Sequence, residues 1–351
     1  MTDFITGIQQ AGIGVTDANA AKMLYKSLFG MDTLIFEDKA AAGLMSGYTG
    51  HEVHERHAIL SMNLSGGGGF EIWQFTSRIP AGPPAAPKLG DLGIFALKIK
   101  SGNVPAAHAF FGRQPGVVIS ALEVAPDERP HFWLTDPYGN HFNIVEGDEW
   151  FRSRKRICGG VTGAVIGVSN MEQSVHFYKK LLGIEETVYA GTAPMMDVPV
   201  GHEEGAVVNR VLLKKQVASR GAFSRLLGSV QVELVEIKGA RRPKIFNNRY
   251  WGDCGFIHLC FDVLNMDGLK QLFLDNGYAF TVDSRNSFEM GTSAGRFCYA
   301  EDPDGTLIEL VETHKIPILK KIGWHIDLQK RKADRPLPDW MIAMLGLNKI
   351  R

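Results

Sequence analysis

An internal repeat limits the fold of this chain more than any other feature. Residues 8–30 (IQQAGIGVTDANAAKMLYKSLFG) contain an apolar run typical of a strand, a polar turn, and an amphipathic helix that ends at Gly30. Residues 161–183 (VTGAVIGVSNMEQSVHFYKKLLG) repeat this order, so that Tyr25 corresponds to Tyr178 and Gly30 to Gly183. The chain therefore reads as a tandem duplication.

Later landmarks recur in the same order at nearly constant spacing. They are Gly69–Ile72 with Gln231–Leu234, Gly93–Leu97 with Gly255–Leu259, and Asp136–Gly139 with Asp302–Gly305. The last pair has the sequence Asp-Pro-x-Gly, which is turn chemistry because Pro fixes φ and Gly accepts a positive φ. The following strands thus begin at equivalent places and carry Asn143 and Glu309 at equivalent positions.

Each half of the duplication contains the strand-helix-strands pattern twice. This predicts an α+β protein of four βαβββ units, at about residues 5–76, 90–148, 160–238 and 253–314. We expect a first domain at residues 1–152, a second at 153–315, and a tail at 316–351. The apolar segment Trp340–Leu347 predicts a short helix that packs on the body of the protein or on a second copy in a homodimer.

Composition narrows the class of partner. The chain of 351 residues has 38 acidic and 38 basic residues, which gives no electrostatic reason to expect nucleic acid or an anionic membrane. We therefore expect a small-molecule substrate. The N-terminus lacks a basic, apolar leader, no run of 18 apolar residues occurs, and the four cysteines show no CxxC spacing. These features favour a cytoplasmic protein, with Cys260 as a buried free thiol.

Several other segments invite a functional interpretation. The run Gly66–Gly69 lacks the GK[ST] and helix of a phosphate loop, so we interpret it as a flexible hairpin. His51, His54 and His57 lie in a polar stretch and are expected to be solvated. The inserts at residues 190–220 and 241–250 either close over a site, with their basic residues pairing an anionic group, or are solvated loops.

The V-x-D/N…Y-x-x-x-L-G pattern, together with Asp-Pro-x-Gly before an apolar strand, resembles the vicinal oxygen chelate superfamily over about residues 5–314. This superfamily includes glyoxalase I and the extradiol ring-cleaving dioxygenases. The resemblance implies two cups of curved mixed sheet, each built from two βαβββ units. It also implies that a metal ion is held by side chains of the first and last strands of the paired units.

The resemblance assigns first-strand positions to Gln10, Ala96, Gly163 and His258, and last-strand positions to Glu71, Asn143, Glu233 and Glu309. Ala96 and Gly163 have no lone pair to donate. If the first unit pairs with the fourth, one cup collects Gln10, Glu71, His258 and Glu309, as in glyoxalase I, and the other cup has no complete ligand set. Four polar residues in apolar strands favour a cation, because buried unpaired carboxylates are costly.

If instead each half closed on itself, the resemblance would imply the dioxygenase iron site at Gly163, His258 and Glu309, with Glu233 as the candidate substitute for the glycine. A third hypothesis is a non-catalytic protein that binds small molecules without metal. The glyoxalase-like pairing is favoured, because Gly163 breaks the iron site.

The favoured hypothesis implies one divalent ion, among Zn, Ni, Co, Mn and Fe, that polarises a substrate carbonyl. Glu309 or Glu71 would remove the neighbouring proton, which is isomerase or lyase chemistry on a small oxygen-rich substrate. Glutathione is not expected as co-substrate. The arginines that glyoxalase I places beside its first-strand ligands are replaced here by Gly14 and Cys254.

Overall fold

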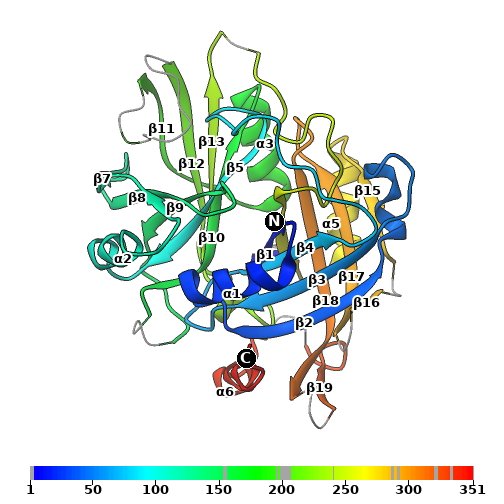
Figure 1. Ribbon diagram of the computed structural model, residues 1–351. Coiled ribbons are helices and arrows are strands. Elements are labelled where there is room, and N and C mark those ends of the chain that lie inside the picture. The colour runs from blue at the N-terminus through cyan, green and yellow to red at the C-terminus, as the bar shows by residue number, and fades with distance from the viewer. Residues whose placement is uncertain are drawn as a thin grey trace.

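The chain folds into two large sheets that lie side by side (Figure 1). The computed structural model describes residues 4–152, 156–194, 197, 207–239, 241–285, 288–290, 293–319, 323–332 and 335–350. The first sheet has the strand order β15-β17-β18-β14-β1-β4-β3-β2, and the second has the order β11-β12-β13-β10-β5-β9-β8-β6. Both sheets contain parallel and antiparallel neighbours. The predicted α+β class is confirmed.

The first sheet combines the first and fourth units. The first unit contains β1 (Ile5–Gly14), α1 (Ala18–Phe29), β2 (Thr33–Ala41), η1 (Gly43–Tyr48), β3 (Glu55–Met62) and β4 (Gly69–Phe75). The fourth contains β14 (Gly255–Val263), α5 (Met266–Asp275), β15 (Phe280–Asp283), β16 (Phe288–Met290), β17 (Ser293–Glu301) and β18 (Leu307–Leu319), and β19 (Trp324–Asp327) pairs with β18. The two units join where β1 and β14 run antiparallel.

The second sheet combines the second and third units. The second unit contains β5 (Gly93–Ser101), α2 (Val104–Phe111), β6 (Val118–Ile119), β7 (Glu123–Val124), β8 (Pro130–Thr135) and β9 (His141–Glu146). The third contains β10 (Cys158–Gly167), α3 (Met171–Leu182), β11 (Glu186–Pro194), β12 (Val207–Lys215), α4 (Ser224–Leu227) and β13 (Val230–Ile237). The favoured pairing of units is confirmed. The sheets therefore do not follow the two halves of the duplication, and the domain boundaries remain a prediction about the sequence.

The motifs that identify the repeat are structural. Asp17 caps α1 by accepting from the backbone N–H groups of Asn19 and Ala20, and Gly30 ends the helix with φ of 66°. The hydroxyl of Tyr25 on α1 donates to Asp136 Oδ2 at 2.8 Å, which ties the helix of the first unit to the turn of the second. The equivalent bond, from Tyr178 to Asp302 at 3.0 Å, ties the third unit to the fourth. Each bond joins the two sheets.

Three clusters of buried apolar residues account for the packing. The largest contains residues of both sheets together with α1, α2, α3 and α5, so it fills the space between the sheets. A second cluster fills the first sheet's other face and includes Phe36, Trp73, Trp251 and Tyr299. A smaller third cluster, which includes Phe95 and Trp133, lies on the corresponding face of the second sheet. We call these two faces the first cup and the second cup.

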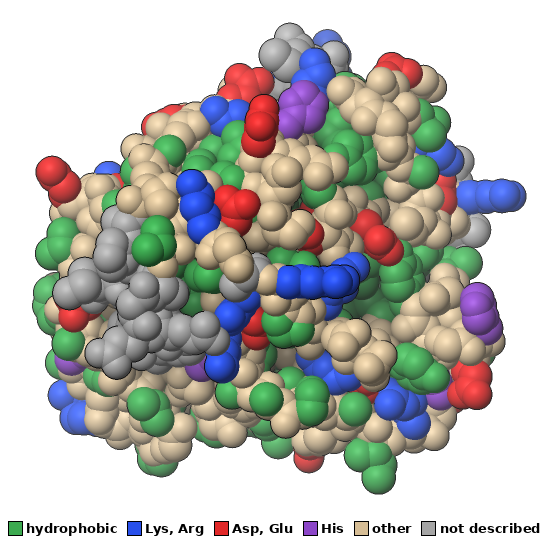
Figure 2. Space-filling view, turned by 90° about the horizontal axis from the view of Figure 1, so that it is seen from above, with side chains coloured by type: hydrophobic (Ala, Val, Ile, Leu, Met, Phe, Trp, Pro, Cys, Tyr) green, Lys and Arg blue, Asp and Glu red, His purple; other side chains and the backbone are tan. Residues whose placement is uncertain are grey.

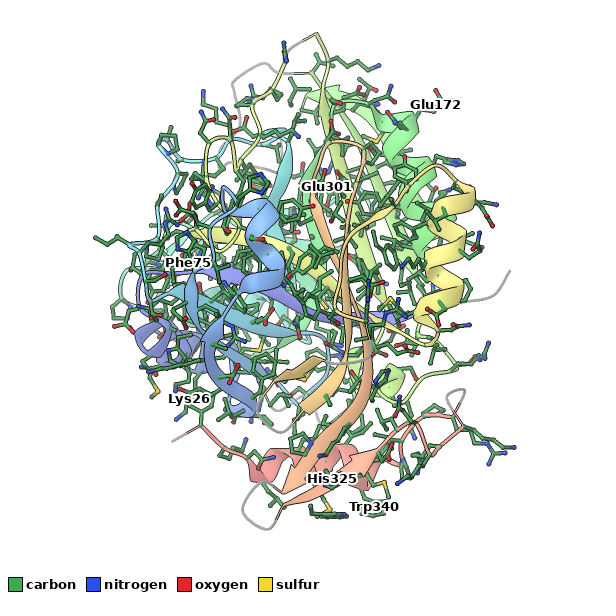
Figure 3. The ribbon with its side chains drawn as sticks, turned by 90° about the vertical axis from the view of Figure 1, so that its right-hand side faces the viewer. Lys26, Phe75, Glu172, Glu301, His325 and Trp340 are labelled. Carbon is green, nitrogen blue, oxygen red and sulfur yellow. The ribbon has the colours of Figure 1, made fainter. Side chains whose placement is uncertain are left out.

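The tail belongs to the first cup. The helix α6 (Asp339–Met344) continues into η3 (Leu345–Leu347), within the segment where a short helix is predicted. The backbone N–H of Leu34 donates to Asn348 O at 2.8 Å, and Ile350 N–H donates to Asp32 O at 2.9 Å. The C-terminal segment thus lies against β2 and β18, at the end of the first sheet where Figure 3 labels His325 and Trp340.

Two loop predictions are settled by the fold. The run Gly66–Gly69 does form the hairpin between β3 and β4, and it lies against β10, where a Cβ at Gly67 would come within 3.0 Å of Gly160 backbone atoms. The predicted solvation is wrong for His54 and His57, which are buried. β3 begins earlier than the polar sequence suggests, and His57 Nε2 lies 2.9 Å from Glu37 Oε1 across the β2-β3 pair.

Candidate metal centre

The four residues predicted to form a metal site lie on four adjacent strands at the middle of the first sheet. Glu309 is on β18, His258 on β14, Gln10 on β1 and Glu71 on β4, in the order in which these strands pair. The side chains come from opposite ends of the sequence and are all buried, with at most 6% of each residue exposed. The tertiary structure therefore brings together the whole predicted set.

The register of the strands explains how the side chains converge. Gly12 lies opposite His258 in the antiparallel β1-β14 pair, and it is also the parallel partner of Glu71. A Cβ at Gly12 would lie 2.4 Å from Cε1 of the His258 ring, so only glycine leaves room for the imidazole. Gln10 lies opposite Cys260, and Cys260 is the parallel partner of Glu309. The two halves of the site are thus related by an approximate twofold arrangement.

The donor atoms meet at one point. His258 Nε2 lies 3.2 Å from Glu71 Oε2 and 3.1 Å from Glu309 Oε2. The Gln10 amide nitrogen donates to the same two carboxylate oxygens at 3.2 and 3.3 Å. The nitrogen of His258 and one oxygen of each carboxylate lie within 4.8 Å of one another.

These residues fit a divalent cation. Gln10 Oε1 is a buried atom with no hydrogen-bond partner in the described part of the chain, and His258 Nε2 contacts the two carboxylates without a well-aligned hydrogen bond. Such orphaned atoms are uncommon in native proteins and point to a missing group. Two carboxylates and one imidazole suit a hard or borderline ion. The Gln10 amide would add an oxygen ligand once it is turned so that Oε1, rather than Nε2, faces the carboxylates.

The buried carboxylates of the site have few positive charges of the protein beside them, and this affects the pKa of each group. Burial and the neighbouring Glu309 carboxylate raise the pKa of Glu71. Burial alone would lower the pKa of His258, but Glu309 and Glu71 raise it to about 10. Burial would also raise the pKa of Glu309, and the imidazolium opposes this and holds it below its ordinary value. Without a metal, a proton on His258 is thus the cation that these carboxylates have.

Tyr299 supports His258, and sequence reasoning did not single it out. Its hydroxyl lies 3.0 Å from His258 Nδ1, on the side of the ring opposite the carboxylates. A partner at Nδ1 fixes the tautomer and the ring orientation that leave Nε2 free for a metal. The sequence could have pointed to Tyr299, because β17 and β18 flank the Asp302–Gly305 turn. This hairpin makes Tyr299 the antiparallel partner of Glu309.

A cavity of about 330 Å³ opens onto this centre. Gln10, Glu71 and Glu309 form its polar base. Most of its wall is apolar and includes Phe36, Trp73, Phe223, Trp251, Phe297 and Leu345. The wall draws on the first and fourth units, on α4 and on η3.

Among the described residues, the second cup has no comparable ligand set. Ala96 and Gly163 offer no donor, Asn143 Oδ1 accepts from Lys98 at 3.1 Å, and Lys98 Nζ lies 2.6 Å from Glu233 Oε2. Arg210 also pairs with Glu233. Burial alone would raise the pKa of Glu233, but Arg210 and Lys98 hold it well below its ordinary value. The protein's own cations therefore occupy the neighbourhood of this carboxylate.

The structure also excludes the alternative iron site. Gly163 is on β10 in the second sheet, whereas His258 and Glu309 are in the first. Glu233 cannot substitute, because it too belongs to the second sheet. The pairing of each half with itself is therefore wrong.

The two inserts do not supply a basic clamp in the described residues. The first contributes to β11 and β12 of the second sheet. In the second, Arg242 pairs with Asp91, and Arg249 donates to the backbone oxygens of Ile245 and Cys254. Their arginines are absent from the described cavity wall. The segment that does reach the cavity is α4, just after the first insert.

Comparisons with known proteins agree with this architecture. Residues 160–310 match the model of the Glyoxalase/Bleomycin resistance protein/Dioxygenase superfamily. This stretch of the chain is similar to a domain of that superfamily. A search of the curated proteins finds no relative by sequence.

Solved structures of this superfamily share the fold of nearly the whole chain. A point mutant of glyoxalase I from Zea mays has a TM-score of 0.54 at 13% identity, covering 87% of this chain and 93% of that one. A putative dioxygenase from Bacillus subtilis has a TM-score of 0.54 at 14% identity, covering 89% of this chain and 86% of that one. Glyoxalase I from Zea mays has a TM-score of 0.52 at 14% identity, covering 87% of this chain and 92% of that one. At these identities the likeness establishes the fold.

In the described residues, no helix has both the length and the hydropathy of a membrane span. Lys and Arg side chains are interspersed with Asp and Glu on the face shown in Figure 2.

Proposed function

We propose that the first cup is a metal-dependent active site that removes a proton from the carbon next to a carbonyl group, as an isomerase or lyase. One observation carries this proposal: His258, Glu71 and Glu309 converge on a single point at the base of a cavity, with Gln10 beside them. A small molecule is the proposed partner, without glutathione.

The residues that would hold the ion are Gln10, Glu71, His258 and Glu309. When bound, a Zn, Ni, Co, Mn or Fe ion would polarise the substrate carbonyl and favour the charge that develops as the proton leaves. Gln10 is neutral, so it would leave more positive charge at the centre than a third carboxylate.

Glu309 is the better candidate for the base. Both carboxylates line the cavity, but the Glu309 side chain is 9% exposed and that of Glu71 is 4% exposed. Glu309 would take the proton and return it to the neighbouring carbon of the substrate.

The proposal is tested by proton exchange. Protein loaded with one equivalent of each candidate metal is mixed with 2-hydroxyacetophenone in D₂O, and loss of the α-proton signal is followed by NMR. We expect exchange with at least one metal, and at least a 100-fold loss of rate in Glu309→Gln. Glu172→Gln, at the exposed first turn of α3, is the control. No exchange with any metal would contradict the proposal.

A competing function is a non-catalytic small-molecule-binding protein, because the second cup demonstrates that this fold can persist without a metal-ligand set. It predicts ligand binding without metal and without exchange. A ring-cleaving dioxygenase would instead consume O₂ with catechol on the iron-loaded protein. The ligand set in the first cup, with one histidine and two glutamates, differs from the two-histidine, one-carboxylate site of such iron enzymes.

A further inference from the structure

We propose that the first cup takes a substrate with its chelating oxygens at one end and an uncharged, ring-sized apolar body at the other, and that the C-terminal segment sets the length of that body. This inference rests on the proposed function and adds a substrate class to it. It departs from the expectation of an oxygen-rich substrate, because most of the cavity wall is apolar and its arginines are paired with carboxylates of the protein.

Aromatic side chains surround the centre. The rings of Trp73 and Trp251 meet edge to face with centroids 4.5 Å apart, and Trp251 in turn lies 6.2 Å from the ring of Tyr299. Tyr299 contacts Phe297 at 6.1 Å. Trp73 comes from the first unit, and the other three come from the fourth unit or the segment just before it. An aromatic wall of this kind favours a ring over a flexible polar chain.

The charged residues of the wall are already paired. Arg56 Nη1 lies 2.8 Å from Asp38 Oδ2, and its guanidinium stacks over Trp73. Arg296 lies 2.8 Å from Asp283 and 2.6 Å from Asp267. Among the described lining residues, these two arginines are the cations, so an anionic body would find no unpaired partner.

The far wall is built from two segments outside the βαβββ pattern. Leu345 of η3 lines the cavity and is 1% exposed. Phe223, Leu226 and Leu227, in or next to α4, line it as well. The backbone N–H of Leu337 donates to Ala222 O at 2.9 Å, and Arg225 pairs with Asp339 at 2.8 Å. The tail and α4 are thus held together as one wall.

The size of the cavity agrees with a small body. Its volume of about 330 Å³ is at the lower end of the range of about 300–1,000 Å³ for ligand pockets. A body of about one ring therefore fits beside the chelating group, and Leu345 is one of the side chains that bound the space for a longer body.

Two hydroxamates test the substrate class, because they share one chelating group and differ in the body. Benzohydroxamate and acetohydroxamate are titrated by calorimetry into protein loaded with one equivalent of Co²⁺ or Zn²⁺, and metal content is checked afterwards. We expect benzohydroxamate to bind about 10- to 100-fold more tightly, since the phenyl ring buries more apolar surface. Equal affinities would overturn the inference and leave the proposed function standing. Failure to retain metal would overturn both.

The role of the tail is tested with 4-phenylbenzohydroxamate, whose body is longer by one ring. Leu345→Ala should raise the affinity for 4-phenylbenzohydroxamate by about tenfold relative to that for benzohydroxamate. Leu345→Trp should lower the affinities for both of these ligands relative to that for acetohydroxamate. Leu347→Ala is the matched control, because Leu347 is on the same short helix but 58% exposed. Thermal unfolding checks that each variant is folded. An unchanged affinity ratio in both folded Leu345 variants would overturn the role of the tail.

Discussion

The two cups have the same strand arrangement but differ in which cations lie beside their buried carboxylates. In the first cup, two carboxylates, an imidazole and an amide converge with no lysine or arginine among the site residues. In the second, the carboxylate of Glu233 is bonded to Lys98 and Arg210, and Arg210 also pairs with Asp197. The first arrangement suits a cation from outside the chain, whereas the second supplies its own.

The difference between the cups depends on one strand position, which is the parallel partner of the last-strand residue in each unit. In the first cup it holds Gly12, the parallel partner of Glu71, and Cys260, the partner of Glu309. In the second it holds Lys98, the partner of Asn143, and Val165, the partner of Glu233. The small residues of the first cup leave space for the donor atoms, and the lysine of the second fills it. A duplicated fold can therefore hold a candidate metal centre in one cup and its own ion pairs at the equivalent place in the other.

The largest expected effect is on metal binding in the first cup. His258→Ala removes the nitrogen donor and leaves two buried carboxylates facing each other, so we expect at least a 100-fold loss of affinity for Zn²⁺ or Co²⁺. Elemental analysis after dialysis and calorimetric titration measure it, with exposed His325→Ala as the control. Unchanged metal content in His258→Ala would contradict the proposal that the first cup, unlike the second, binds a metal ion.

The matching change in the second cup should affect stability and leave metal binding intact. Glu233→Gln removes the partner of Lys98 and Arg210, and breaking a buried ion pair costs about 3–5 kcal/mol. Urea unfolding at pH 7 measures the free energy of unfolding, and metal content is measured in parallel. Loss of metal in this variant would mean that the cups are not independent.

Gly12→Ala sharpens the comparison at the equivalent position. Its Cβ would meet the His258 ring, so the imidazole must move and we expect metal affinity to fall by about 10- to 100-fold, as for changes that misorient a ligand. Gly43→Ala is the control, since a Cβ there contacts nothing within 4 Å. Full metal affinity in Gly12→Ala would show that the His258 ring can move aside from the new Cβ and still bind the metal.

The smallest effect is expected in the pH dependence of stability. Glu233 has a pKa below its ordinary value in the folded protein, so it contributes stability above its unfolded pKa of about 4.3, and this is lost as the pH falls. Urea unfolding between pH 6 and 3 should show a steeper decline for the native protein than for Glu233→Gln. Parallel curves would mean that Glu233 is not held ionised.

The sequence predicts the repeat and the fold well because both depend on local chemistry. The Asp17 cap, the Gly30 stop and the Asp-Pro-x-Gly turns form where their residues are, whatever surrounds them. The partners of Tyr25 and Tyr178 could not be foreseen, since each hydroxyl bonds a turn more than a hundred positions away.

For the site, the four candidate ligands follow from equivalent positions in the repeat, and their types alone indicate a metal. The sequence left open which units share a sheet, because tandem units can pair in either way. That choice was made by the antiparallel contact of β1 with β14, which brings Gln10 and Glu71 to His258 and Glu309. The positioning of Tyr299, the pairing of Glu233 and the closure of the cavity by Leu345 were likewise decided only by tertiary packing, since each depends on segments that the chain separates.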